Sequence, residues 1–502
     1  MATVPPKRIL FITREVVPFF YGGIGTQFLS MIKFLEKRGH AVFLLTRRHP
    51  NFDLRTYRQA YGETPVFFVS SAENGGNAAP ETLAWREAPV NFSYALAVLE
   101  TFDKICATVR PDIVFVADYE AEGLFLLLKA SSGRYRHVRF VLMIEGLTHD
   151  VLLTFEGHDS PRAAGCLTAD PQNQLTCAME EMCIGLADEI VVPSHIYWNQ
   201  VRRRLKIDRA ARIVPNAIDR DTFGHARTVG VETPAFSDPG YILFVGRLDR
   251  HKGADILLEA YLDAVRDFPH FDARLLMIGR DCFCKAYNRS FTEYWNEKIP
   301  SALKERVKFI GPVQHAGLAA YYRHAALCVF PSRWEVFGIV CLEAMFCGCP
   351  VIVSKGTGLE EILGPDLSEF AVDVSDSKKR CAELKKRMIA VRDARREKGG
   401  LEARFKKRAE EILSAGASGL VDLVENQTPW ERPGGLPAPG LVLKKNIEMA
   451  SALNGAMREM IKALATSAEP RKAAAHAPDM TLSSRLRRKA KRILSRRPAR
   501  PA

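Results

Sequence analysis

Two runs of alternating strand and helix segments, separated by a stretch rich in turn-forming residues, constrain the fold of this chain most strongly. The first run contains apolar strand segments at 8–13, 113–116, 138–144, 189–192 and 212–214. The pattern restarts with strand segments at 241–245, 274–278, 307–310, 327–330 and 351–353. Such alternation predicts a parallel, doubly wound sheet in each run. We therefore expect an α/β domain over residues 1–230, a second over 231–420, and an extension over 421–502.

The composition is typical of a globular enzyme that does not span a membrane. None of the apolar runs in the 502 residues approaches the roughly 18 that a membrane helix needs. The first apolar run, residues 9–12, ends in Arg14 and Glu15, which is unlike a signal peptide. Eleven cysteines are scattered along the chain, an odd number that favours free thiols and a cytoplasmic location.

Two Cys-x-Cys pairs raise the alternative of a metal site. Cys282/Cys284 and Cys347/Cys349 lack the spacing and the further ligands of a zinc tetrahedron. Buried thiols are the better interpretation, and we predict no metal.

The segment from 330 to 350 carries the strongest chemical signal. It places Glu335 in a strand-to-helix loop and Glu343 inside the helix that begins near Gly338. Ligands of open α/β sheets bind at the carboxyl ends of strands, and a helix amino terminus attracts a diphosphate. The two carboxylates could then accept hydrogen bonds from sugar hydroxyls. The alternative is a helix-entry charge and a surface residue.

A basic pair follows the strand that opens the second domain. Arg247 and Lys252 lie in the sequence Gly-Arg-Leu-Asp-Arg-His-Lys-Gly. Two fixed cations can neutralise the charge that develops on a departing diphosphate. For either residue alone, an exposed surface charge would be the better interpretation.

Together these motifs resemble the retaining glycosyltransferases of family 4, which have the GT-B fold of two Rossmann-like domains facing a cleft. The resemblance covers roughly residues 7–420. It rests on Phe-Val-Gly-Arg-Leu with a following Lys-Gly, on Val-Pro-Asn-Ala-Ile-Asp at 214–219, and on Pro-Ser-x-x-Glu-x-Phe-Gly-x-x-x-x-Glu-Ala. Three such motifs in one chain are highly specific.

The resemblance implies a role for each matching residue. Arg247 and Lys252 would bind the donor diphosphate, Glu335 the donor sugar, and Glu343 the ribose. Further donor contacts would come from Asn216, Phe337 and Gly338, and from the glycine turn at Gly22 and Gly23. The donor would be a nucleotide-diphosphate sugar, and neither a cofactor nor a metal would be required.

The chain departs from the family pattern after the strand at 138–144. Family members commonly have a histidine there, whereas this chain has Glu145, with His149 four residues later. Both are candidates for contact with the sugar or the acceptor, although an exposed loop position explains His149 equally well. Asp118, after another strand, is a third candidate, and helix capping is its simpler explanation.

Positive charge is concentrated at the carboxyl end. Residues 471–502 hold eleven basic residues and one acid, which gives +10, so the remainder carries +13 − 10 = +3. The segment 484–500 has an amphipathic pattern that could lie on anionic lipid at the inner face of the plasma membrane, although a solvated tail is as good an interpretation. Aromatic residues do not interleave with the basic ones, so we expect no nucleic acid.

The expected function is sugar transfer to a saccharide, a glycolipid, including a lipid-linked saccharide, or a small molecule. One alternative is another sugar-nucleotide enzyme, such as an epimerase. A second is a non-catalytic scaffold with the same fold, because fold alone does not determine function. The sequence leaves the donor base, the sugar, the linkage and the oligomeric state open.

Overall fold

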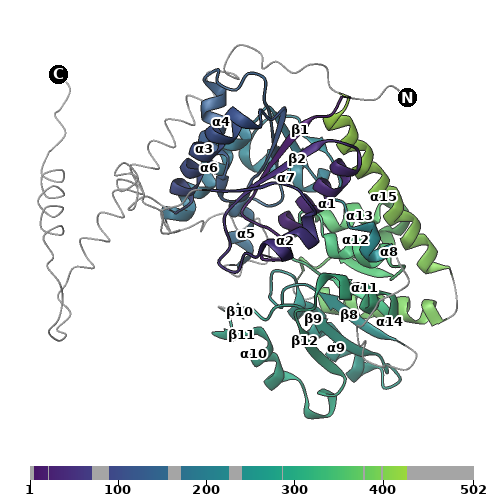
Figure 1. Ribbon diagram of the computed structural model, residues 1–502. Helices are drawn as coiled ribbons and strands as arrows, with labels where there is room; N and C mark the ends of the chain where they lie inside the picture. Colours follow the sequence, from purple (N-terminus) through teal and green to yellow (C-terminus); the bar gives the residue numbers. More distant parts are fainter. Residues whose placement is uncertain are drawn as a thin grey trace, which may run out of the picture.

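The structure, a computed structural model, describes residues 5–20, 22–69, 90–155, 171–224, 240–284, 286–376, 379–396 and 400–426. These residues form two α/β domains, the first above the second in Figure 1. The turn-rich stretch over 231–239 and the whole tail from 427, including its basic segment, lie outside the described residues. Among the described helices, none is both long and apolar enough to cross a membrane.

The first domain is built on a parallel sheet of seven strands in the order β3-β2-β1-β4-β5-β6-β7. The strands are β1 (Arg8–Ile12), β2 (Ala41–Thr46), β3 (Val66–Phe68), β4 (Ile113–Ala117), β5 (Arg139–Met143), β6 (Glu189–Val192) and β7 (Arg212–Ile213). The helices are α1 (Gly23–Lys37), α2 (Leu54–Tyr61), α3 (Val90–Thr108), α4 (Leu124–Ser131), α5 (Thr148–Phe155), α6 (Pro171–Leu186) and α7 (His195–Leu205), with a 3-10 turn, η3 (Tyr119–Ala121).

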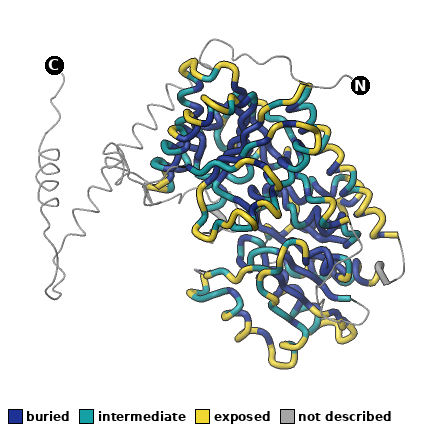
Figure 2. Tube along the Cα trace, viewed as in Figure 1, coloured by how far each residue is buried: buried dark blue, intermediate teal, exposed yellow. Residues whose placement is uncertain are grey.

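The central strands are apolar at nearly every position because helices cover both faces of the sheet. In β1, Leu10 and Ile12 pack in a cluster with α3, α4 and α6. Ile9 and Phe11 point to the other face, where they pack with α1 and α2. Figure 2 shows these strands as the buried centre of the upper domain.

The second domain is built on a parallel sheet of six strands in the order β12-β9-β8-β13-β14-β15. The strands are β8 (Tyr241–Val245), β9 (Arg274–Ile278), β12 (Val307–Gly311), β13 (Ala325–Phe330), β14 (Val351–Ser354) and β15 (Ala371–Val372), and β10 (Phe283–Cys284) and β11 (Arg289–Ser290) form a separate antiparallel pair. The helices are α8 (Arg220–Gly224), α9 (Ala254–Asp267), α10 (Phe291–Lys298), α11 (His315–His324), α12 (Ile339–Phe346), α13 (Gly358–Leu363), α14 (Arg380–Arg396) and α15 (Leu401–Val424), with 3-10 turns η4 (Ser301–Leu303) and η5 (Pro365–Phe370).

The doubly wound α/β architecture predicted for both runs is confirmed. In each sheet the strand order reverses direction beside the first strand, between β1 and β4 and between β8 and β13. Ligands of such sheets bind outside the carboxyl ends of the strands at this reversal. The loops that follow these four strands are therefore where a site is expected.

Helix α15 is rich in charged residues, yet it packs against both domains. Its first half packs on α12 in the second domain, but Leu420, Leu423 and Val424 lie in the core of the first. Figure 1 shows it running alongside both domains. The chain also crosses between the domains at Pro215, after β7. Helix α15 passes close to this crossing, since a Cβ built on Gly416 would lie 2.5 Å from the carbonyl oxygen of Pro215. The apolar stripe within the charged sequence explains both contacts.

Candidate functional site

The loop after β8 presents the predicted basic pair. Asp249 organises this loop, because its Oδ1 accepts a hydrogen bond from the Lys252 amide at 2.8 Å and its Oδ2 lies 3.0 Å from Nε of Arg247. The Arg247 side chain keeps about a third of its surface exposed, with a relative accessibility of 35%. The carboxylate therefore holds the backbone of Lys252 and the side chain of Arg247.

Lys252 meets the predicted glutamate of the neighbouring strand loop. Its Nζ lies 2.5 Å from Oε2 of Glu335, which follows β13. Gly253 is required for this approach, because it has φ +71° and a Cβ there would lie 1.9 Å from the carbonyl oxygen of Pro331. The two motifs, separated by more than 80 residues in the chain, form one site at the strand-order reversal.

A buried ion pair beneath these loops was not predicted. Arg333 forms two parallel hydrogen bonds with Asp255, at 2.7 and 2.8 Å, and both side chains are almost fully buried. Its backbone N–H also donates to the carbonyl of His251 at 3.0 Å. Such a bidentate pair fixes geometry as well as adding energy. It holds the Lys252 loop against the Glu335 loop.

Glu343 is buried inside α12, so the alternative of a surface residue is wrong. Its Oε1 lies 2.6 Å from Nε2 of His315, and its Oε2 accepts a hydrogen bond from the Tyr322 hydroxyl at 3.1 Å. Burial lowers the pKa of His315, but the charge of Glu343 and its hydrogen bond outweigh that effect and raise the pKa. Nearby, Gly338 is the residue before α12 with φ +98°, and Phe337 packs in the core of the second domain.

On the opposite side of the cleft, the loop after β5 presents Glu145. Its Oε2 accepts a hydrogen bond from Nδ2 of Asn216 at 2.9 Å. Burial raises the pKa of Glu145 to about 8, an effect that Asp118, Glu15 and Glu335 reinforce by their charges. The structure thus brings the predicted residues Asn216, Glu145 and Glu335 together across the two domains.

The helix-capping explanation of Asp118 is wrong. Its side chain makes no cap hydrogen bond to η3, and its Oδ2 instead accepts from the amides of Glu145 and Gly146 at 3.2 and 3.0 Å. Burial raises the pKa of Asp118 to about 7. Asp118 therefore positions the Glu145 loop.

The exposed loop position suggested for His149 is also wrong, because His149 lies in α5 with its side chain 13% exposed, beside Asp150.

Helix α1 begins at Gly23, so the predicted glycine turn is largely the first turn of a helix. The amide of Gly25 donates to Oε2 of Glu15 at 3.0 Å, and a Cβ built on Gly22 would clash with this carboxylate. Burial raises the pKa of Glu15. A carboxylate of the chain therefore lies at the helix end where a phosphate was expected, and a ligand phosphate there would have to displace it.

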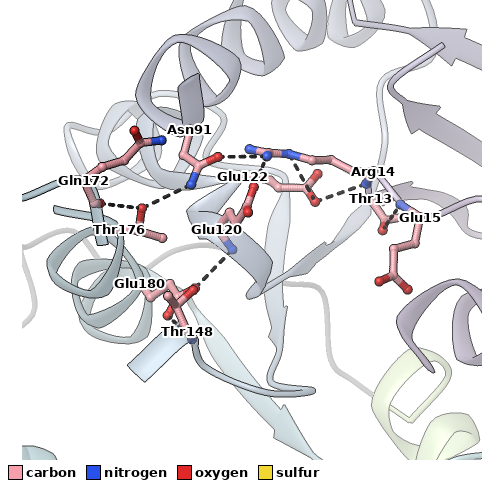
Figure 3. Close-up of polar contacts among 10 residues, drawn as sticks. All are labelled: Thr13, Arg14, Glu15, Asn91, Glu120, Glu122, Thr148, Gln172, Thr176 and Glu180. Atoms are coloured by element: carbon pink, nitrogen blue, oxygen red, sulfur yellow. Dashed lines mark hydrogen bonds and ion pairs between the residues drawn. The ribbon is translucent and has the colours of Figure 1, made fainter. Parts of the chain in front are cut away.

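Beside Glu15, a network of buried polar side chains lines the first domain, as Figure 3 shows. Arg14 donates to Asn91 at 3.0 Å and pairs with Glu120, and its amide donates to Glu122 at 3.1 Å. Burial raises the pKa of Glu122 to about 8. Glu180 accepts from the amides of Glu120 and Thr148 at 3.1 and 2.8 Å, and Asn91 also bonds to Thr176. These contacts tie the loops after β1, β4 and β5 to α3 and α6.

The two domains are packed together around the cleft. Trp334 lies in the apolar cluster of the first domain, and a Cβ on Gly146 would lie 3.3 Å from its ring. Glu361 of α13 binds the start of α7, accepting from Ser194 Oγ and from the amides of His195 and Ile196 at 2.8 to 3.0 Å. Sequence reasoning missed α13, although Gly-Thr-Gly after a strand is a signal for it.

Two family models match the chain, one in each domain. Residues 21–222 match the model described as Glycosyltransferase Family 4, and residues 239–389 match Glycosyl transferases group 1. An uncharacterised glycosyltransferase of Methanocaldococcus jannaschii is 35% identical over 370 residues, which are 71% of this chain and 82% of that protein. The chain belongs to the group 1 glycosyltransferase family.

Other relatives match a smaller part of this chain. A D-inositol 3-phosphate glycosyltransferase of Pseudarthrobacter chlorophenolicus is 32% identical over 164 residues, 32% of this chain and 38% of that protein. For the relatives with this name, the matches cover between 34% and 58% of their length.

Solved structures share the GT-B fold of this family member. Sucrose-phosphate synthase from Thermosynechococcus elongatus superposes with a TM-score of 0.59 at 20% identity, covering 84% of this chain and 98% of that one. HepE of Anabaena, solved with UDP and glucose, superposes with a TM-score of 0.55 at 16% identity, covering 83% and 99%. The predicted fold, two Rossmann-like domains facing a cleft, is confirmed. Among the described residues, no group of three His, Cys, Asp or Glu side chains could hold a metal ion.

Proposed function

We propose that this chain is a retaining glycosyltransferase that moves a hexosyl group from a nucleotide-diphosphate sugar to a hydroxyl group of an acceptor. The observation that carries the proposal is the contact between Lys252 and Glu335 at the reversal of the second sheet, opposite Glu145 of the first domain. A cation for the diphosphate and a carboxylate for the sugar are then adjacent, which suits a nucleotide sugar because its diphosphate is bonded directly to its sugar.

Each residue has a specific role in this proposal. Arg247 and Lys252 bind the diphosphate and stabilise the charge that grows on it as the glycosidic bond breaks. Glu335 accepts hydrogen bonds from the sugar hydroxyls. Glu343 accepts from the ribose, using the lone pairs that His315 and Tyr322 leave open. The amide groups at Gly338 and at the start of α13 complete the donor side.

Retention follows from attack on the face that the diphosphate leaves. A phosphate oxygen of the leaving group accepts the proton of the acceptor hydroxyl while the new bond forms, so that neither a protein nucleophile nor a metal is needed. The enzyme's task is to hold donor and acceptor in position and to stabilise the leaving diphosphate.

The acceptor would lie against the first domain, near the network of Figure 3. The guanidinium of Arg14 is already engaged by Asn91 and Glu120. A neutral, hydroxyl-rich saccharide, glycolipid or small molecule therefore suits this side better than the phosphorylated acceptor named for the inositol relatives.

The test is turnover of a panel of UDP-, GDP- and ADP-sugars, followed by release of the nucleoside diphosphate. Wild type is compared with Arg247→Ala and Glu335→Ala. Matched controls in the same domain are Arg266→Ala, an exposed residue paired with Asp263, and Glu305→Ala, an exposed residue paired with Lys308. The anomeric configuration of the product is read by NMR.

We expect turnover of one donor with retention, a loss of about a hundredfold or more in both site variants, and near wild-type rates in the controls. Inversion would contradict the retaining mechanism. The absence of turnover together with the absence of any donor-induced thermal shift would favour the scaffold alternative instead.

We also propose that the basic segment 484–500 attaches the protein to the anionic inner face of the plasma membrane, close to a lipid-linked acceptor. Basic residues near such a surface contribute about 1 kcal/mol each. Deleting residues 471–502 should abolish co-sedimentation with anionic liposomes at low salt. Unchanged binding after the deletion would contradict this attachment.

A further inference from the structure

In the first domain, carboxyl groups follow the carboxyl ends of three adjacent strands. Glu15 follows β1, Asp118 follows β4 and Glu145 follows β5. The charges of Asp118, Glu15 and Glu335 all raise the pKa of Glu145, so Glu145 is within electrostatic reach of each of the three. Family members commonly have a histidine where this chain has Glu145, so the carboxyl group changes what the pocket can bind.

Three acceptor atoms in this cluster are buried and lack a hydrogen-bond donor in the described part of the chain. They are Oε1 of Glu145, Oδ1 of Asp118 and Oδ1 of Asn216. Asn216 and Asp118 are 2% and 1% exposed, and the amide of Asn216 contacts Glu145 directly. Buried acceptors are rarely left without a donor in proteins. The cluster is therefore prepared for a ligand that donates several hydrogen bonds.

Donor binding would increase the negative charge of the pocket. Lys252 now pairs with Glu335 at 2.5 Å. If Lys252 turns toward the diphosphate, as the proposed function requires, Glu335 loses this partner while it remains within electrostatic reach of Glu145. A sugar hydroxyl donates one hydrogen bond and carries no charge, whereas an ammonium group donates three and carries a positive charge. The ammonium group therefore suits these buried carboxyl groups better than a hydroxyl does.

A metal ion is a poorer candidate for this positive charge. The described residues contain no set of side chains spaced to hold one.

We propose that the donor sugar of this enzyme carries a protonated primary amine, bound by Glu145 with the support of Asn216. This inference rests on the proposed function and narrows its donor class to nucleotide amino sugars. Burial raises the pKa of the Glu145 carboxyl in the ligand-free chain. An arriving ammonium would favour its ionised form, so that the charge pair forms only with the correct donor.

The experiment compares nucleotide sugars that differ at one carbon. UDP-glucosamine is compared with UDP-glucose and UDP-N-acetylglucosamine, and 4-amino and 6-amino hexoses are compared with their hydroxyl counterparts. The measured quantity is the ratio of kcat/KM between the amino and the hydroxyl donor. A partly unfolded sample lowers both values equally, so this ratio reports recognition and not stability.

We expect the amino donor to be preferred by about tenfold or more, because hydrogen bonds between charged groups are the strong ones. Glu145→Gln keeps the shape of the side chain and should reduce the preference to within about threefold. Glu36→Gln is the control, because Glu36 bonds to Thr64 at a distance from the strand ends and should leave the preference intact. If no donor turns over, the same pairs are compared by dissociation constant.

Three outcomes would overturn the inference. The first is equal or better use of hydroxyl donors, which would leave the proposed function standing. The second is an amine preference that persists in Glu145→Gln. The third is release of UDP from UDP-glucose that is stimulated by free glucosamine, which would assign the ammonium to the acceptor. Failure of the proposed function would differ from all three, since neither turnover nor binding of any donor would be observed.

Discussion

Nζ of Lys252 and Oε2 of Glu335 lie 2.5 Å apart, so the cation assigned to the diphosphate is paired with the carboxylate assigned to the sugar. Both side chains are mostly buried, with 26% and 14% exposed. The pair keeps two charges compensated in the ligand-free cleft. A donor has to exchange this contact for its own phosphate and hydroxyl groups.

Lys252→Met should therefore lower kcat/KM for the donor by about a hundredfold to a thousandfold, since it removes a cation aimed at the developing charge. Steady-state kinetics with the best donor checks this. Lys308→Met, at an exposed lysine paired with Glu305, is the control and should leave kcat/KM within about threefold. Equal losses in both variants would contradict the assignment.

Gly253→Ala should both destabilise the protein and impair donor turnover. The new Cβ would meet the Pro331 carbonyl at 1.9 Å in a backbone region that favours glycine, at a cost of about 3 kcal/mol or more. Gly311→Ala is the matched control, because Gly311 also has positive φ but open space around it, and about 1 kcal/mol is expected. Urea unfolding measures both variants. Similar losses of unfolding free energy in the two variants would mean that the backbone around Gly253 shifts and relieves the clash.

His315 should contribute a pH-dependent part of the stability. Its pKa is raised in the folded chain, so its stabilising contribution is fully present below the unfolded pKa of about 6.5 and is lost as the pH rises through the folded pKa. Thermal unfolding should show the largest deficit of His315→Gln at pH 6 and below, with a smaller deficit at pH 9. The exposed His270→Gln should show no such trend. A pH-independent deficit would contradict the charge pair with Glu343.

Glu122 should behave in the opposite way to His315, because its ionised form destabilises the folded chain. Burial raises its pKa to about 8, so the folded chain is favoured while this carboxyl is protonated and loses stability as the pH rises from about 4.5 through 8. Glu122→Gln removes this loss, and its stability relative to wild type should rise by about 1 kcal/mol or more between pH 5 and pH 9. Glu63→Gln, at an exposed glutamate, is the control. A constant difference across this range would show that the carboxyl is ionised throughout.

The sequence predicts the two doubly wound sheets and the loops that carry Lys252 and Glu335. The contact between these two side chains follows from the strand order, because β8 and β13 are neighbours whose carboxyl ends share one edge. The sequence could not predict that Glu15 binds the start of α1, since that contact depends on the path of the loop between them. The sequence also indicates the wrong role for Asp118, for a similar reason. A carboxylate before a helix resembles a cap in one dimension, but here the adjacent strand end supplies amides in a better position.

The tertiary role of α15 was also hidden in the sequence. Its charged residues dominate the pattern, and the apolar residues that pack on two different domains form one continuous stripe. Periodicity reports that a helix has a buried face, but it does not identify which partner buries each half.

The close approach of Gly416 to Pro215 has a mechanical consequence. The polypeptide passes between the domains twice in the described part of the chain, and both passages touch at this point. Two adjacent tethers would favour rotation about the point where they meet over separation of the domains. Asn216, the next residue after Pro215, lies beside this point and bonds to Glu145. Opening the cleft would then swing Glu335 and Lys252 through an arc while the Asn216–Glu145 end stays nearly still, so the sugar end of the cleft would be the last part to open.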